Sequence, residues 1–78
     1  MFMDRRIAEA LFVQLENCVI PKYREECSMI IDAFLEEDFS EGEFKRLIAY
    51  LIKRVKEERK EEVLKKIETK VGKIELLD

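Results

Sequence analysis

Residues 40–71 decide the fold, and they read SEGEFKRLIAYLIKRVKEERKEEVLKKIETKV from Ser40 to Val71. Ser40 and Glu43 have the spacing of a capping box, in which each side chain accepts a backbone N–H at the start of a helix. The stretch has no Pro, and its one Gly, Gly42, lies near the start. Gly72 follows the stretch, where a left-handed helix cap commonly falls. We therefore expect one long third helix over residues 41–71, about 45 Å long at 1.5 Å per residue.

Apolar residues in this stretch form two sets on different faces of a continuous helix. The first set has the i, i+3, i+4, i+7 spacing of a core-facing stripe and consists of Phe44, Leu47, Ile48, Leu51, Ile52 and Val55. The charged residues 56–62 follow, and the second set is Val63, Leu64, Ile67 and Val71. At about 100° per residue the second set is centred roughly 130° from the first, so one flat surface cannot bury both.

Two arrangements can bury the second set. A straight helix would present it to a second chain, whereas a break within residues 57–61 would fold it back onto the core of its own chain. We favour the straight helix, because Glu61–Lys65 and Glu62–Lys66 are well-ordered i, i+4 pairs and no breaker residue is present.

The composition predicts an all-α protein. Of the 78 residues 42% are charged, and the chain has two Gly and one Pro, so turn-forming residues are few. A high charged fraction with few amide side chains is also typical of thermophile proteins. A chain of this size builds a modest core, and oligomerisation commonly adds to its stability.

Residues 1–78 are expected to form a single helical domain with a helical hairpin before the long helix. The periodicity predicts helix 1 over about 4–18 and helix 2 over about 21–37, with Pro21 in the first turn of helix 2. Helix 2 ends in acidic residues, the wrong sign for a helix C-terminus, so we expect it to fray there unless a cation offsets them. The tail 72–78 is expected to be either disordered or packed as an irregular segment, with a short strand or further helix as alternatives.

The residue inventory argues against catalysis and metal chemistry. The chain has no His, the commonest general base and transition-metal ligand. We expect Cys18 and Cys27 to be buried thiols, because their offset across the Pro21 turn does not suit a disulfide. A calcium loop centred on Gly42 would need oxygen ligands where Phe39 and Ile48 stand. We therefore expect a non-enzyme with no catalytic residue, metal or cofactor, and no signal peptide or membrane span, which favours the cytoplasm.

Basic residues on the expected third helix form a stripe about 100° wide. The stripe consists of Lys45, Arg46, Lys53, Lys56 and Lys60. Residues 1–40 are net acidic whereas 41–78 are slightly basic, so this helix could contact phosphates. A neighbouring acidic stripe and the acidic whole chain oppose that interpretation.

The second apolar set is the most informative functional feature of the sequence. An exposed apolar patch usually marks an interaction surface. We therefore expect a small, dimeric helical bundle in which Val63, Leu64, Ile67 and Val71 form the oligomer or partner interface. The function we favour is a non-catalytic protein-interaction or regulatory module, a homodimer with an unidentified protein partner. The alternative is a nucleic-acid-associated regulator that uses the basic stripe.

Overall fold

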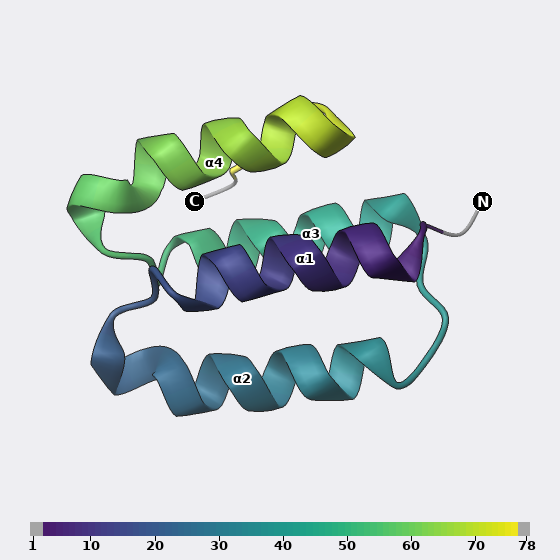
Figure 1. Cartoon of the computed structure of the whole chain (residues 1–78), viewed down its shortest axis with the longest axis horizontal. Helices are drawn as coiled ribbons and strands as arrows, with labels where there is room; N and C mark the ends of the chain where they lie inside the picture. The colour runs from purple at the N-terminus through teal and green to yellow at the C-terminus, as the bar shows by residue number, and fades with distance from the viewer. Residues whose placement is uncertain (1–2, 77–78) are drawn as a thin grey trace.

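The computed structural model describes residues 3–76, and in that part of the chain it has four helices and no strand. The helices are α1 (Arg5–Glu16), α2 (Pro21–Leu35), α3 (Glu41–Ile52) and α4 (Glu57–Val71). Helix α1 packs against the other three, and α2 and α4 flank the α1–α3 pair on opposite sides (Figure 1). The all-α prediction is confirmed, and the chain forms a small helical bundle. Within these residues, none of the helices is both long enough and apolar enough to cross a membrane.

Side-chain caps fix where α1 and α3 begin. The Asp4 carboxylate accepts the backbone N–H of Arg6 at 2.9 Å. At α3 the predicted capping box is present, because the Ser40 hydroxyl accepts the Glu43 N–H at 3.1 Å and the Glu43 carboxylate accepts the Ser40 N–H at 2.8 Å. These bonds satisfy N–H groups that the first turn of a helix leaves without intrahelical partners.

The acidic end of α2 receives the cation that its sequence lacks. The Arg5 guanidinium, from the start of α1, donates to the backbone carbonyls of Leu35 and Glu37. The same guanidinium carbon lies 5.6 Å from the centre of the Phe39 ring. A positive charge at a helix C-terminus complements the helix dipole, so Arg5 ties the N-terminus of one helix to the C-terminus of the next.

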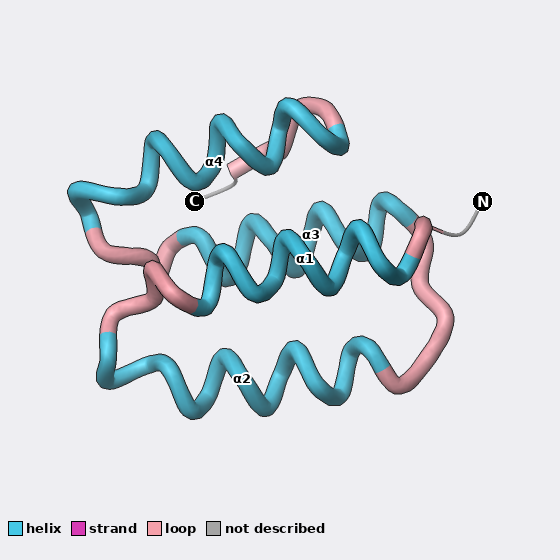
Figure 2. The backbone as a smooth tube through the Cα atoms, in the orientation of Figure 1, coloured by secondary structure: helices cyan, strands magenta, loops and turns pink. Residues whose placement is uncertain are grey.

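The prediction of a single helix over 41–71 is wrong, because α3 ends at Ile52 and a separate helix, α4, begins at Glu57 (Figure 2). The four connecting residues reverse the chain direction, and α4 packs back against α1 and α3. The physical reason for this interruption of the helix is the offset of about 130° between the two apolar sets. A break turns the second set toward the same core as the first, which buries more apolar surface than a straight helix in one chain could.

A backbone contact between two loops replaces the helical hydrogen bonds lost at the break. The Ile20 N–H donates to the Arg54 carbonyl and the Lys56 N–H donates to the Cys18 carbonyl, both at 2.9 Å. These bonds form an isolated antiparallel bridge between Val19 and Val55. The loop needs no Gly or Pro, because its polar backbone groups find partners in the α1–α2 loop.

The two hairpins, α1–α2 and α3–α4, are structural repeats, although no internal repeat is evident from the sequence. Equivalent positions are 36 residues apart, as with the N-caps Asp4 and Ser40 and the bridge residues Val19 and Val55. Backbone angles repeat as well. The C-caps Asn17 and Lys53 have φ, ψ of −65°, −17° and −67°, −17°, and the N-caps of α2 and α4 are equally close. The two hairpins therefore share the same local design, and the Val19–Val55 bridge joins equivalent positions.

One continuous core joins both hairpins. Phe12 is its aromatic centre, with ring centroids 5.9 Å from Phe34 and 5.0 Å from Phe44. Val63, Ile67 and Val71 of α4 are buried in the same core. Cys18 and Cys27 are free and buried, as predicted, and burial raises the pKa of the Cys27 thiol.

Candidate nucleic-acid interface

A groove runs along the outward face of α3 and is closed on one side by the tail after α4. Its walls are two adjoining hollows that share Arg46 and Glu75. Cationic side chains dominate the lining, together with an exposed tyrosine. The complete set is Gly42, Lys45, Arg46, Ala49, Tyr50, Lys53, Arg54, Lys73 and Glu75. We call this surface the α3 groove.

Three residues of the predicted basic stripe line the α3 groove, and two do not. Lys45, Arg46 and Lys53 lie on α3 or at its C-cap and reach the groove. Lys56 lies beyond the break as the N-cap of α4, and Lys60 pairs with Glu57 at 3.0 Å within that helix. The predicted stripe is therefore not continuous, because it assumed one helix over residues 41–71 and α3 ends at Ile52.

Two cations of the groove were missed by the sequence analysis. Arg54 and Lys73 are brought to α3 by the turn after Ile52 and by the tail, so they do not share a helical face with the stripe. A correct prediction of the helix break would have identified Arg54, because the turn after residue 52 directs its side chain toward Tyr50.

Arg54 and Tyr50 contact each other within the groove. The Arg54 guanidinium carbon lies 3.8 Å from the centre of the Tyr50 ring, and its Nη1 donates to the Tyr50 carbonyl at 3.0 Å. The Tyr50 hydroxyl donates to Glu26 of α2 at 3.0 Å. That hydrogen bond raises the pKa of the Tyr50 phenol, so the ring stays neutral at physiological pH. Tyr50 is nevertheless 38% exposed.

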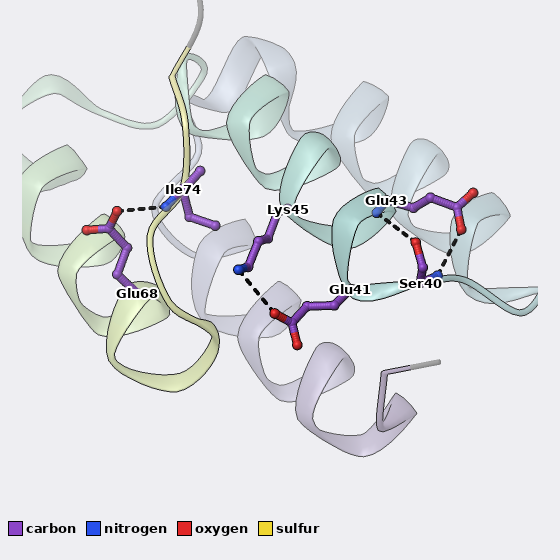
Figure 3. Close-up of polar contacts among 6 residues, drawn as sticks. All are labelled: Ser40, Glu41, Glu43, Lys45, Glu68 and Ile74. Carbon is purple, nitrogen blue, oxygen red and sulfur yellow. Dashed lines mark hydrogen bonds and ion pairs between the residues drawn. The ribbon is translucent and has the colours of Figure 1, made fainter. Parts of the chain in front are cut away.

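The tail is held in place beside α3 by Gly72 and Ile74. Gly72 has φ of +86°, a value that favours glycine, and turns the chain back along α4. Ile74 is buried, and its N–H donates to the Glu68 carboxylate at 2.8 Å (Figure 3). As far as residue 76 the tail is neither strand nor helix, and only Ile74 of this part is buried. Leu77 and Asp78 lie outside the described residues.

Carboxylates neutralise only part of the positive charge in the groove. Lys45 pairs with Glu41 at 3.1 Å (Figure 3), and Arg54 lies 3.8 Å from Glu26. Glu75 contributes a third carboxylate from the tail. Within residues 3–76, Arg46 and Lys73 have no ion pair. Among the described residues, Arg46 and Lys73 are therefore two groove cations that no ion pair occupies.

The predicted interface residues of α4 lie mostly inside their own chain. Val63, Ile67 and Val71 are 5%, 1% and 9% exposed, and Leu64 is partly buried against the same core. The exposed apolar face on which the predicted interface depends is therefore not present on α4. The oligomeric state itself stays a prediction.

Apolar side chains are exposed instead on α1. Ile7 is 45% and Val13 is 59% exposed, and the exposed Ala10 lies between them. At helical spacing these three residues form a short line on the side of α1 that faces away from the core. We call it the α1 strip.

No family model, curated protein or solved structure matches this chain.

Proposed function

We propose that this chain is a small non-catalytic binding module that holds the backbone of a nucleic acid in the α3 groove. The observation that carries the proposal is the meeting of five cationic side chains with an exposed aromatic ring. They come from α3, from the turn that follows it and from the tail. Cations that neutralise phosphates release counterions and supply sequence-independent affinity, and an aromatic ring beside them can contact a base.

The charge distribution of the whole chain supports the same face. Residues 1–38 contain nine acidic and four basic residues, whereas residues 39–78 contain nine acidic and eleven basic ones. The α1–α2 hairpin would repel a polyanion, and the α3–α4 hairpin would attract it. An asymmetric field of this kind orients a charged partner during encounter, so a nucleic acid should approach α3 in preference to the acidic hairpin.

Binding of fluorescently labelled oligonucleotides, measured by anisotropy over a series of salt concentrations, tests the proposal. We expect dissociation constants of roughly 1–100 μM near physiological salt, as for other sequence-independent contacts. If about three phosphates are neutralised, the logarithm of the association constant for a single strand should fall with the logarithm of the salt concentration, with a slope of about −2. The double variant Arg46→Glu with Lys53→Glu should weaken binding at least tenfold.

A charge-matched variant separates a local site from a general effect of net charge. Lys22→Glu with Lys65→Glu makes the same change in charge at exposed positions of α2 and α4 that do not line the groove. This control should bind within about twofold of the unaltered chain. Equal losses in both double variants, or no binding at low salt, would overturn the proposal.

Self-association is a second candidate function, and the α1 strip favours it. The occupant we propose for the strip is a second copy of the chain, packed antiparallel with the two helices crossing at Ala10. In that pairing Ile7 lies opposite Val13 of the second copy, so the surface is complementary to itself, as an isologous interface requires. A small residue at the crossing point lets the two helices approach closely. Such a homodimer would leave the α3 groove open on the opposite side.

Light scattering behind gel filtration tests the dimer. We expect twice the chain mass at high micromolar concentration, and Val13→Glu should restore the monomer mass without loss of helicity. Met29→Glu is the matched control, because Met29 is 66% exposed on α2 and lies outside the strip. A monomer mass at all concentrations would reject self-association and leave the nucleic-acid proposal untouched.

A further inference from the structure

The α3 groove is built around an aromatic ring whose position is fixed on two sides. The Arg54 guanidinium lies 3.8 Å from the ring centre of Tyr50, and the phenol hydroxyl is held 3.0 Å from Glu26. Arg54 also lies 5.7 Å from the Tyr23 ring, which restrains it from α2. Because the ring is already ordered, a base that stacks on it incurs little of the entropy cost of immobilising a free side chain.

Cations lie on both sides of this ring along the helix. Arg46 precedes Tyr50 by one helical turn and Lys53 follows it by nearly one, so the three span about 10 Å at 1.5 Å per residue. Lys73 of the tail lines the same end of the groove as Arg46. At about 3.4 Å per nucleotide along one strand, that span matches roughly three phosphates. The groove therefore suits a short run of backbone with one base beside Tyr50.

The tail makes the groove a poor fit to duplex DNA. A bare α-helix of about 10–12 Å diameter fills a major groove about 12 Å wide. Here residues 73 and 75 line the groove together with α3, so the combined width exceeds that of a single helix. In a duplex, moreover, the faces of the bases are covered by their neighbours and cannot reach Tyr50.

We infer that the ligand of the α3 groove is single-stranded nucleic acid, with one base stacked on the Tyr50–Arg54 pair and its phosphates on Arg46, Lys53 and Lys73. This inference depends on the proposed function, because it specifies the ligand of the same site. Aromatic and guanidinium planes are the surfaces on which unpaired bases commonly stack, and such stacking tolerates any sequence.

Three probes of equal length test the inference on the unaltered chain: a 15-nucleotide single strand, its duplex, and a 15-nucleotide abasic strand. The abasic strand has the phosphates without the bases, so it isolates stacking without any change to the protein. We expect the single strand to bind at least fivefold more tightly than the duplex or the abasic strand, given the usual worth of one stacked base.

Variants at Tyr50 provide a second, independent readout. Tyr50→Leu should lower affinity for the single strand by roughly 5- to 100-fold, to the level of the abasic strand, and should leave abasic binding unchanged. Tyr50→Phe keeps the ring and should retain most of the affinity. Circular dichroism confirms that each variant is folded.

The outcomes distinguish the two proposals. Equal affinity for all three probes, with binding still lost in the Arg46→Glu, Lys53→Glu variant, would overturn the single-strand inference and leave the proposed function standing. No binding of any probe at low salt would overturn both.

Discussion

Glu16, in the last turn of α1, is a carboxylate that the fold holds partly out of solvent. Burial, together with the nearby Asp32 of α2, raises its pKa above the ordinary value of 4.5. The folded state therefore binds the proton of Glu16 more tightly than the unfolded state does. Its stabilising contribution is complete below about pH 4.5 and is lost as the pH rises through the raised value.

Glu16→Gln should accordingly raise the melting temperature at pH 7 and have almost no effect at pH 4. The amide keeps the shape of the protonated carboxyl group but never ionises, so the cost of ionisation disappears. Thermal unfolding followed by circular dichroism at both pH values measures this difference. Glu9→Gln, at an exposed site on the same helix, is the control and should change neither value. A destabilising Glu16→Gln at pH 7 would contradict the argument.

The capping box of α3 allows a second prediction at this scale. Ser40→Ala removes the hydroxyl that accepts the Glu43 N–H at 3.1 Å. The expected cost is about 1 kcal/mol, which corresponds to a fall of roughly 4–8 °C in melting temperature for a domain of this size. Ser40→Gly should cost only a few tenths of a kcal/mol, because glycine is itself tolerated at this position. An unchanged melting temperature in Ser40→Ala would show that the hydroxyl is not the source of the stability.

The same residues show which side-chain roles follow from the sequence. Ser40 and Glu43 act over a spacing of three residues, so the pattern is visible in the sequence. Arg5 acts on carbonyls 30 and 32 residues away. Its role as a cap of α2 depends on the packing of two helices, and no local pattern predicts it.

At the scale of elements, α4 is attached to the bundle by its buried face, and a charge placed there should unfold the chain. Ile67 is 1% exposed. Ile67→Asp removes a core side chain, a change that costs about 2–5 kcal/mol even for alanine, and leaves an unpaired carboxylate in the core. The sum approaches the whole stability of a 78-residue domain, about 4–12 kcal/mol. We expect loss of most helical circular dichroism at 25 °C.

Lys65→Asp provides the control on the same helix, because Lys65 is exposed. It should leave the spectrum and the urea midpoint nearly unchanged. If Ile67→Asp instead retained its helicity and halved the mass of a dimer, α4 would be packing against a second chain and the fold-back arrangement would be wrong.

The helix break separates what the sequence predicts from what it does not. Periodicity predicted α1 and α2 to within two residues at each end, because each has one apolar face. The segment 53–56 contains neither Gly nor Pro, so the local pattern favoured continuity. The predicted Glu62–Lys66 pair is present although the helix is broken, so such a pair does not distinguish a broken helix from a straight one. The burial of apolar side chains in the tertiary structure overrode this local preference for a continuous helix. Val55 and Ile67 reach the same core only if the chain turns between them.

At the scale of the whole molecule, the two hairpins are joined by side-chain packing along their length and by backbone hydrogen bonds between the α1–α2 and α3–α4 loops. Val19 and Val55 are 0% exposed and form the backbone bridge between the two loops. The remaining core residues are drawn from all four helices and the tail. Separating the hairpins would therefore expose the core, so neither hairpin should open without global unfolding.

Amide hydrogen exchange tests this cooperativity at two loop residues. The N–H groups of Ile20 and Lys56 donate across the bridge at 2.9 Å, so they can exchange only when the hairpins separate. We expect both to exchange as slowly as the best-protected helical amides, with opening free energies near the global value. The Asp38 amide, in the exposed connection between α2 and α3, should exchange orders of magnitude faster. Rapid exchange at Ile20 and Lys56, together with slow exchange of the helical amides, would contradict this expectation. It would mean that the two hairpins separate at the bridge while each hairpin stays folded.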